Sequence, residues 1–397
     1  MRQVLQQSVT GDSELIKRIN LSIVINTIRE KGPISRVEIA KLSKLNKATV
    51  SSLVDELLEK DYVVEIGAGR SSVGRKPILL NFNDSSGYVI GIEVNVGFIK
   101  AVVINLSAEV IAKRKIPTST NEKEVMKSLY DVIDEMKGLV PECSLGVVGI
   151  GISVAGIVNY ETGTLVSAPN AGLHNIPLKH LVESYSGIRT IVDNDCNASA
   201  IGEYYFGSGK GRDQLILLSL SAHGIGTGIF VNGEVFRGRN GFAGEMGHMT
   251  INMVGPLCNC GNRGCWELYA SPRALIQDYM EKKGLVDAPT VEEIIEMANQ
   301  NDKEAISALT QVGEYLGVGL SNVVNTFDTE AIIIRGAMSQ GERWLLNPIQ
   351  RNLQERCFFY SSTKVEIIPS FWGQDAAAVG AACEIIQRLF YTHEYKL

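Results

Sequence analysis

The sequence predicts an α/β protein that begins with a winged helix-turn-helix. After residue 87, short apolar runs typical of strands alternate with helical stretches, as in Tyr88–Val94, Glu122–Leu139 and Val147–Val154, and this alternation is typical of α/β folds. Before residue 83, three helical patterns precede two β-prone runs around a Gly-rich basic tip. The polar break at 83–87 separates the two regions. A chain of 397 residues is long enough for two or three domains.

Composition excludes several classes of protein. The apolar fraction of 45% is that of an ordinary globular chain. The first 20 residues contain several charged side chains, so we expect no signal peptide. The charge-free stretches 143–160 and 214–233 are broken by glycines, so we expect no membrane span. Four of the seven cysteines have no paired spacing, which favours free thiols and a cytoplasmic protein: Cys143, Cys196, Cys357 and Cys383.

Helix signals define the head. A first helix is predicted from apolar residues at helical spacing, Leu15, Ile19, Ile23 and Ile28, and from a stop at Gly32-Pro33. A second helix opens with the capping box Ser35-Arg-Val-Glu38, and we expect its buried side to hold Ile39, Ala40 and Leu42. A third helix begins after Asn46, a favourable N-cap, and buries one apolar stripe: Val50, Leu53, Val54, Leu57 and Leu58.

The third helix has the polar face of a DNA-recognition helix. Its first turns offer four polar side chains: Lys47, Thr49, Ser51 and Ser52. The β-prone runs 62–66 and 78–82 then flank a tip that holds Arg70, Arg75 and Lys76. Recognition helices and wings place such side chains against bases and phosphates. A three-helix dimerisation module with a charged hairpin is the alternative interpretation of this segment.

The charge distribution favours contact of the head with nucleic acid. Residues 1–83 carry 13 Lys and Arg against 9 Asp and Glu, whereas the remaining residues carry 25 against 35. A basic head on an acidic body is expected to approach DNA with the head alone.

The first part of the body ends in a polar motif. Strands are predicted at 88–94, 100–105, 147–154 and 190–192, and the last of them leads into Asn194-Asp195. A carboxylate and an amide at a strand end can form paired hydrogen bonds to vicinal hydroxyls. An Asx turn that starts the next helix is the alternative.

One His and three Cys lie within 18 residues, at His248, Cys258, Cys260 and Cys265. Cys3His is a closed tetrahedral zinc set, and the glycines of this loop let so short a segment fold back on an ion. We therefore predict one structural Zn²⁺ per chain, because four protein ligands leave no position for a metal-bound water. Since Cys-x-Cys is not the usual Cys-x2-Cys, chance proximity is the alternative.

Two segments, Gly244-Glu-Met-Gly-His248 and Cys258-x-Cys-Gly-x2-Gly-Cys265-x-Glu267, resemble the signature of the ROK family. That family contains bacterial sugar kinases and sugar-responsive repressors, and the resemblance covers nearly the whole chain. It implies an actin-like body of two ribonuclease-H-like lobes behind a winged helix-turn-helix that the repressors carry and the kinases lack. We expect the head at 1–83, a first lobe at 87–200 onto which a helix near 376–394 packs, and a second lobe with the zinc loop at 201–375.

The resemblance also implies a sugar site. The ligands carried over by motif are Asn194, Asp195, Glu245, His248 and Glu267, with looser matches at Gly156 and Asn170. In the family's kinases, the aspartate that matches Asp195 of this chain is the general base. His248 is expected to bind zinc through one ring nitrogen and to face the sugar with the other. Trp266 lies beside Glu267, so its fluorescence is expected to report sugar binding.

The nucleotide side departs from the pattern of the kinases. Glu93-Val-Asn-Val-Gly-Phe98 stands where the kinases have Asp-x-Gly-Gly-Thr, whose backbone cradles phosphate. The second phosphate turn includes Ser221-Ala-His-Gly, and the adenosine motif reads Arg335-Gly-Ala337. Bulky residues where a backbone must approach a nucleotide closely argue against ATP binding. We therefore expect no enzymatic activity, with Asp195 serving as a hydrogen-bond acceptor.

These features predict a cytoplasmic, zinc-containing transcriptional repressor. Residues 241–271 look most similar to the family's repressors of xylose-utilisation operons. This implies operator DNA as a partner, D-xylose as the effector that releases it, and a homodimer that reads paired half-sites. A repressor that answers glucose or N-acetylglucosamine and a sugar kinase are the alternatives.

Overall fold

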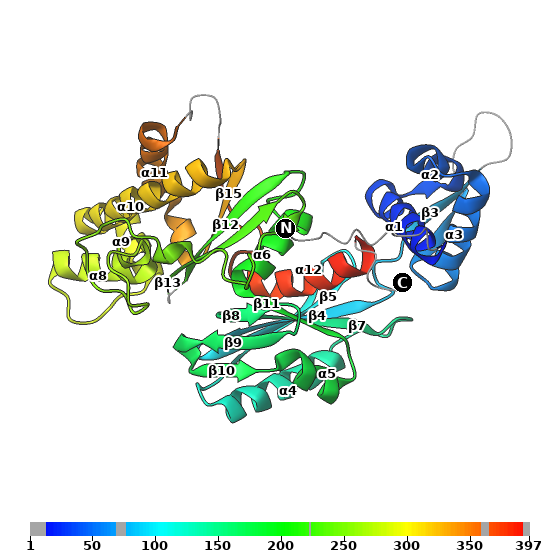
Figure 1. Cartoon of the computed structure of the whole chain (residues 1–397), viewed down its shortest axis with the longest axis horizontal. Coiled ribbons are helices and arrows are strands. Elements are labelled where there is room, and N and C mark those ends of the chain that lie inside the picture. The colour runs from blue at the N-terminus through cyan, green and yellow to red at the C-terminus, as the bar shows by residue number, and fades with distance from the viewer. Residues whose placement is uncertain (1–12, 69–76, 222–223, 359–364, 392–397) are drawn as a thin grey trace, which may run out of the picture.

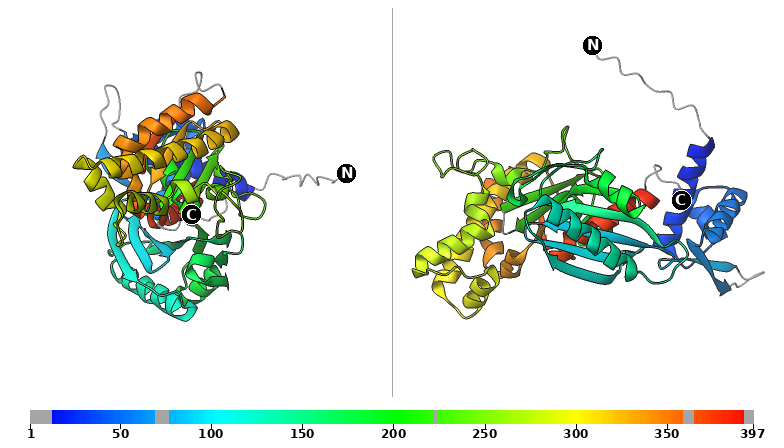
Figure 2. Two further views of the ribbon diagram at one scale, coloured as in Figure 1. Left: turned by 90° about the vertical axis from the view of Figure 1, so that its left-hand side faces the viewer. Right: turned by 90° about the horizontal axis from the view of Figure 1, so that it is seen from below.

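The structure is a computed structural model that describes residues 13–68, 77–221, 224–358 and 365–391. It consists of a small N-terminal head and a body of two α/β lobes, and Figure 1 shows the head at one end of the molecule. The right-hand view of Figure 2 shows the same order along the long axis, with the head and the second lobe at opposite ends. A winged helix-turn-helix in front of a mixed α/β body confirms the predicted fold class.

The head is built from three helices and a three-stranded sheet. The helices are α1 (Ser13–Lys31), α2 (Arg36–Ser43) and α3 (Lys47–Glu59), and the strands lie in the order β1 (Ile34–Ser35), β3 (Ile78–Phe82), β2 (Val63–Ala68). The predicted capping box is present, because Ser35 and Glu38 each accept a hydrogen bond from the backbone N–H of the other. The side chain of Asn46 accepts from the N–H of Thr49 and so caps α3.

One side-chain orientation predicted for the head is wrong. Leu42 was expected on the buried side of α2, but it is 54% exposed. It lies two positions from the buried Ala40 and is therefore rotated by about 200° around the helix, away from the core.

The first lobe is a five-stranded sheet in the order β11-β7-β4-β5-β6. Its strands are β4 (Tyr88–Asn95), β5 (Phe98–Asn105), β6 (Val110–Pro117), β7 (Val147–Val154) and β11 (Thr190–Asn194). Strand β4 runs parallel to β7 and antiparallel to β5. Ile90 and Ile92 pack toward α4 (Glu122–Gly138), whereas Val89 packs on the other face. Because both faces are covered, β4 is apolar along nearly its whole length.

A small sheet extends this lobe beside the end of β11. It contains β8 (Ile157–Asn159), β9 (Thr164–Ala168) and β10 (Leu173–Ile176), and it is followed by α5 (Leu178–Ser186).

The second lobe repeats the plan with a sheet in the order β14-β13-β12-β15-β16. Its strands are β12 (Gln214–Ser221), β13 (Gly224–Val231), β14 (Glu234–Val235), β15 (Ala331–Arg335) and β16 (Glu366–Pro369). Its helices are α7 (Glu267–Ala270), α8 (Pro272–Lys283), α9 (Val291–Asn299), α10 (Lys303–Phe327) and α11 (Glu342–Arg356). Ile216 and Leu218 pack among the residues of α10 on one face of this sheet.

Helices α6 (Asp195–Phe206) and α12 (Ala376–Phe390) lie between the two sheets. Helix α12 packs along α6 and on β4 and β7, whereas α6 packs on β12 and β13. Figure 1 shows α12 running from the centre of the body toward the head. The two helices therefore join the lobes into one body.

Glycines bring these helices into backbone contact with their neighbours. A Cβ atom on Gly380 of α12 would overlap the carbonyl oxygen of Ala198 in α6. A Cβ atom on Gly151 of β7 would overlap the carbonyl oxygen of Ala381. Such close approach is possible only where both surfaces lack large side chains.

The head is attached to the far end of α12. The carbonyl oxygen of Phe390 accepts hydrogen bonds from the Ser22 hydroxyl at 2.5 Å and from Asn26 Nδ2 at 2.8 Å. The Arg29 guanidinium lies 4.4 Å from the centre of the Phe390 ring and donates to the carbonyl oxygen of Leu106 at 3.2 Å. Helix α1 of the head is thus bonded to both α12 and the first lobe.

We predict that Gly380→Ala destabilises the protein by about 1–3 kcal/mol, because its new Cβ atom meets backbone that cannot rotate away. Gly138→Ala is the matched control, since Gly138 ends helix α4 and a Cβ atom there meets nothing within 4 Å. The control should be neutral or more stable by up to about 1 kcal/mol. Urea unfolding measures both, and equal stability of the two variants would contradict the packing argument.

Candidate functional site

The polar motif at the end of β11 starts helix α6. The Asn194 side chain accepts hydrogen bonds from the N–H groups of Cys196 and Asn197, so the Asx turn named as the alternative interpretation is present. Its Nδ2 atom donates to the carbonyl oxygen of Gly156 at 3.0 Å. Since an amide NH2 group has two donors, this arrangement leaves Asn194 one N–H for a ligand while it holds the loop after β7 in place.

Asp195 is bound by an arginine of the other lobe. Asp195 is the first residue of α6 and is 8% exposed. Its Oδ2 atom lies 2.5 Å from Nη2 of Arg335, which ends β15 in the second lobe. Arg335 also donates from Nε to the Ser219 hydroxyl at 2.9 Å. The sequence indicated that Arg335 crowds a nucleotide, but it did not reveal this ion pair.

Three candidate sugar ligands of the second lobe lie together. His248 Nε2 is 3.9 Å from a carboxylate oxygen of Glu245, and His248 Nδ1 is 3.3 Å from Oε1 of Glu267. Burial raises the pKa of Glu245, the carboxylates of Asp195 and Glu267 raise it further, and His248 opposes the rise. Asp195 therefore lies near enough to Glu245 to affect its pKa, although the two residues belong to different lobes.

The two loosely matched residues are placed differently. Gly156 follows β7 and is held by Asn194, as described above. Asn170 is exposed in the short 3-10 helix Pro169–Ala171. Within the described residues, no hydrogen bond or ion pair joins Asn170 to the other six candidates, so Asn170 stays a prediction without a contact to support it.

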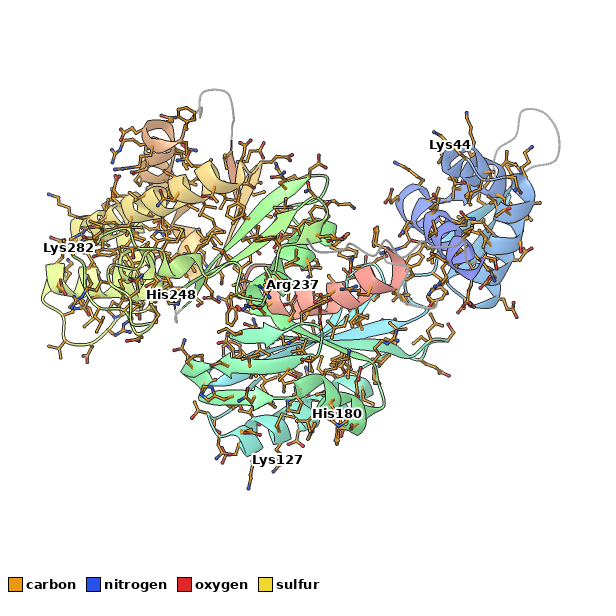
Figure 3. All side chains as sticks on the ribbon, viewed as in Figure 1. Lys44, Lys127, His180, Arg237, His248 and Lys282 are labelled. Carbon is orange, nitrogen blue, oxygen red and sulfur yellow. The ribbon has the colours of Figure 1, made fainter. Side chains whose placement is uncertain are left out.

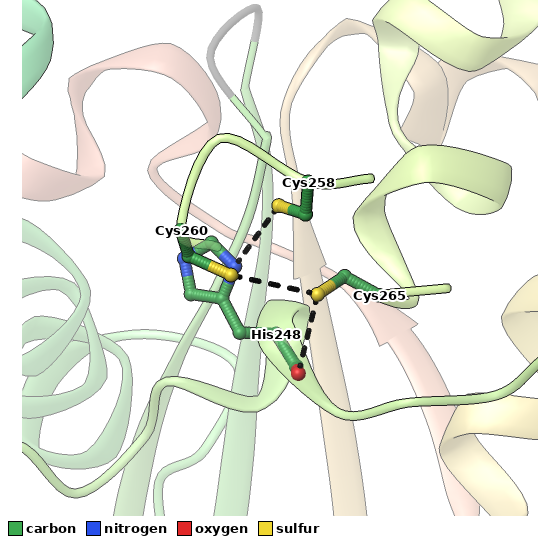
Figure 4. A group of neighbouring side chains, drawn as sticks. All are labelled: His248, Cys258, Cys260 and Cys265. Atoms are coloured by element: carbon green, nitrogen blue, oxygen red, sulfur yellow. Dashed lines mark hydrogen bonds between the residues drawn. The ribbon is translucent and has the colours of Figure 1, made fainter. Parts of the chain in front are cut away.

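The predicted zinc residues converge. The donor atoms of His248, Cys258, Cys260 and Cys265 all lie within 4.8 Å of one another (Figure 4). The sulfur atoms of Cys260 and Cys265 are 3.6 Å apart, and Cys258 Sγ is 3.7 Å from His248 Nδ1. A zinc tetrahedron with Zn–S of about 2.3 Å has edges of about 3.8 Å, so these two distances fit the ion. Nδ1 faces the thiols and Nε2 faces Glu245, which matches the double role expected of His248.

A second charged cluster, which was not predicted from the sequence, lies beside Asn194 and Asp195. Arg237 donates to Asp193 at 2.6 Å and to Glu384 of α12 at 2.9 Å, and its guanidinium lies 3.8 Å from the centre of the Tyr160 ring. Burial raises the pKa of Glu384 to about 7, with a further contribution from Asp193 and an opposing one from Arg237. Figure 3 labels Arg237 beside α12 and His248 in the second lobe. Arg237, like Arg335, carries a guanidinium from the second lobe to an aspartate near the end of β11.

Arg335 also lines a cavity of about 730 Å³. Its walls come from both lobes and include Glu93, Asn95 and Lys100 of the first and Ser219 and Arg335 of the second. Asn95 Nδ2 donates to the Glu93 carboxylate at 2.9 Å, so these two side chains are bonded to each other beside the turn that matches the phosphate-cradling turn of the kinases. Residues 222–223 of the second phosphate turn, which include His223, lie outside the described residues.

The expected fluorescence reporter faces away from the site. Trp266 is fully buried among the apolar residues of the second lobe, and its indole N–H donates to the carbonyl oxygen of Tyr315 at 2.8 Å. Its position in the chain next to Glu267 does not bring its ring toward a ligand, because the following helix turns the ring into the core. The ring of Trp266 therefore does not face the candidate sugar ligands, and a fluorescence response to sugar stays a prediction.

The predicted DNA-contacting residues of α3 are accessible in part. Lys47 and Ser52 are exposed, and Thr49 and Ser51 are half-buried. Lys44 is exposed just before α3, and Figure 3 shows it at the outer surface of the head. The predicted wing residues Arg70, Arg75 and Lys76 lie outside the described residues. None of the helices in the described ranges is both long and apolar enough to cross a membrane.

Comparison with known proteins assigns both parts of the chain. Residues 18–64 match the winged helix-turn-helix DNA-binding family, and residues 89–388 match the ROK family. The chain belongs to the ROK family. The signature at 244–267 and the two-lobed body are therefore family features, as the resemblance implied.

Individual ROK proteins match the chain over different lengths. The xylose repressor of Bacillus spizizenii is 37% identical over 95% of this chain and 97% of its own length. The crystal structure of a ROK transcriptional regulator, a homologue of the Escherichia coli MLC protein, has a TM-score of 0.83 at 29% identity and covers 95% of this chain and 97% of that one. A ROK glucokinase from Streptomyces griseus, solved with glucose and AMPPNP, has a TM-score of 0.65 at 31% identity and covers 75% of this chain and 98% of that one.

Proposed function

We propose that this chain is a sugar-responsive transcriptional repressor that binds operator DNA through its head and releases it when D-xylose binds between the lobes. The observation that carries the proposal is the attachment of a winged helix-turn-helix to a sugar-kinase-like body through helix α12. The 37% identity to the xylose repressor of Bacillus spizizenii supports D-xylose as the effector. Glucose and N-acetylglucosamine are the alternative effectors.

Operator recognition is assigned to the exposed start of α3 together with the wing. Lys47 and Ser52 are exposed there, and the N-terminal turns of a recognition helix are the part that reaches base edges and phosphates. The chain acts as a homodimer, because such heads read paired half-sites.

Effector binding is assigned to polar groups from both lobes. The carboxylates of Asp195, Glu245 and Glu267 accept hydrogen bonds from sugar hydroxyls, and Asn194 supplies the remaining N–H of its amide. The carboxylates belong to different lobes, so a sugar that bonds to all of them favours one lobe arrangement over others. The sugar can change operator affinity only as far as it binds one lobe arrangement more tightly than the other.

Helix α12 provides the route from the sugar site to the head. Glu384 in its middle is bonded to Arg237 of the second lobe, and Arg237 also bonds Asp193, which immediately precedes Asn194. Phe390 at its end is bonded to Ser22 and Asn26 of the head. A movement of the lobes therefore displaces the support on which each head rests, and in a dimer it changes the spacing of the two heads.

A sugar kinase is the alternative function, and the Arg335–Asp195 ion pair argues against it. Transfer of a phosphoryl group needs a carboxylate free to accept the sugar proton and a loop that cradles phosphate. Here one oxygen of the Asp195 carboxylate is bound to a guanidinium, and the side chains of Asn95 and Glu93 are hydrogen-bonded where the kinases have a glycine-rich phosphate turn. We therefore propose a chain that binds sugar without phosphorylating it.

Zinc is proposed as a structural ion held by His248, Cys258, Cys260 and Cys265. It would crosslink the loop that carries Glu267, whose Oε1 atom lies 3.1 Å from Cys258 Sγ. Fixing this loop also fixes the ring of His248 and thereby the face of the sugar site that His248 forms.

Lys47→Ala should weaken operator binding and lower the slope of log K against log salt by about one unit, because one phosphate contact is lost. Lys60→Ala is the matched control, since Lys60 follows the other end of the same helix and pairs with Glu56. Fluorescence anisotropy at several salt concentrations measures both. The same slope for Lys47→Ala and Lys60→Ala would argue against this DNA-binding face.

D-Xylose should weaken operator binding, and operator DNA should weaken D-xylose binding by the same factor, because linkage is reciprocal. A tenfold effect corresponds to about 1.4 kcal/mol of coupling. Calorimetric titration of D-xylose with and without operator tests this directly. Equal affinities in the two titrations would exclude D-xylose as the inducer, and glucose and N-acetylglucosamine serve as parallel titrants.

Freshly purified protein should contain about one zinc per chain, and Cys260→Ser should lose it, because three ligands hold the ion more weakly than four. Cys143→Ser is the control, since Cys143 lies outside the cluster. Elemental analysis provides the measurement. Retention of a full equivalent of zinc by Cys260→Ser would show that the ligand assignment is incorrect.

A further inference from the structure

Arg335 occupies an unusual position for an arginine. The residue is 6% exposed and stands at the end of the buried strand β15. Burial by itself lowers the pKa of Arg335, but the nearby carboxylates, that of Asp195 above all, hold it above its usual value. A buried guanidinium without an anionic partner is very unfavourable, so Arg335 is held in this position by its ion pair.

The ion pair crosses the boundary between the lobes. Arg335 and its second partner Ser219 belong to neighbouring strands of the second sheet, whereas Asp195 follows β11 of the first. The Asp195 backbone is fixed as well, because its carbonyl oxygen accepts a hydrogen bond from the Ser199 hydroxyl at 2.6 Å. Both ends of the pair are therefore held by further hydrogen bonds, and the pair joins a strand end of the second sheet to the residue that follows β11 of the first.

The two oxygens of Asp195 are in different surroundings. Oδ2 receives the Arg335 hydrogen bond at 2.5 Å. Oδ1 receives a long contact from the Cys196 thiol at 3.7 Å, which is a weak donor. A carboxylate oxygen has two lone pairs, so Oδ1 keeps capacity for a stronger donor such as a sugar hydroxyl.

We propose that Arg335 is a positioning residue of the effector site: it holds Asp195 through Oδ2 so that Oδ1 accepts a sugar hydroxyl, and it fixes the lobe spacing at which this contact forms. The proposal rests on the proposed function, since it assigns a role within the same sugar site. Arg335 need not touch the sugar, because it acts through Asp195. The guanidinium of Arg335 thus places a buried positive charge next to the carboxylate that binds the sugar.

A double-mutant cycle tests whether Arg335 acts through Asp195. The four proteins are the wild type, Arg335→Met, Asp195→Asn and the double variant, and D-xylose affinity is measured by calorimetry for each. Arg335→Met should lower the affinity at least tenfold in the wild-type background. In the Asp195→Asn background, the same change should alter the affinity by less than about twofold, because the carboxylate that it positions is already gone. Effects that multiply across the cycle would overturn the proposal.

Two further variants separate positioning from a loss of fold. Arg335→Lys keeps the charge and should recover part of the affinity lost in Arg335→Met, whereas a purely space-filling role predicts no recovery. Arg212→Met is the matched control, because it removes another ion pair of the second lobe, the one with Glu366 at 2.5 Å. It should leave D-xylose affinity within twofold of the wild type. If Arg335→Met fails to fold, Arg335→Lys decides: wild-type affinity there overturns the proposal, because a flexible ammonium cannot reproduce both guanidinium bonds.

The outcomes also distinguish this proposal from the function on which it rests. A wild-type protein that binds none of D-xylose, glucose and N-acetylglucosamine overturns both. A wild-type protein that binds one of these sugars, together with an Arg335→Met variant that binds it equally well, overturns the role of Arg335 and leaves the proposed function intact.

Discussion

The close packing of α6 and α12 between two sheets is the constraint on which the rest of the structure depends. Gly380 and Gly151 allow backbone to touch backbone at this centre, so the helices have little freedom to shift separately. Several of the groups discussed above belong to these two helices. Asn194 and Asp195 start α6, Glu384 lies within α12, and Phe390 ends it. The first-lobe half of the candidate site and the support of the head are therefore parts of one closely packed unit.

Two similar arginine–aspartate ion pairs join the lobes. Two arginines of the second lobe, Arg237 and Arg335, reach Asp193 and Asp195 at the end of β11. Only one residue, Asn194, separates the two aspartates, so the second lobe is bonded to the first at two neighbouring points. Apolar packing alone would let the lobes close at many angles, whereas buried ion pairs have strong distance and angle requirements. The pairs thus select one arrangement, which a bound sugar can favour or disfavour.

Local chemistry could be predicted from the sequence, and long-range pairing could not. The capping box at Ser35 and the cap at Asn46 depend on residues three positions apart, so they are readable in any window of the chain. The metal cluster is also nearly local, and its cysteine spacing indicated it. Arg335 is 140 residues from Asp195, and no periodicity links two such positions. Side-chain direction was the other failure: Leu42 was misplaced because the packing around α2, and not the neighbouring residues in the chain, decides which side of the helix is buried.

The order of the elements along the chain has a consequence for biosynthesis. The first sheet is complete at Asn194, but the helix that covers one of its faces begins at Ala376, after the whole second sheet. During translation this apolar face stays uncovered until that helix has emerged from the ribosome. Contacts of such long sequence separation form slowly, and uncovered strands invite aggregation in the meantime. The same order affects the head. Its residues are made first, but they can pack on Phe390 only when nearly all of the chain has been made.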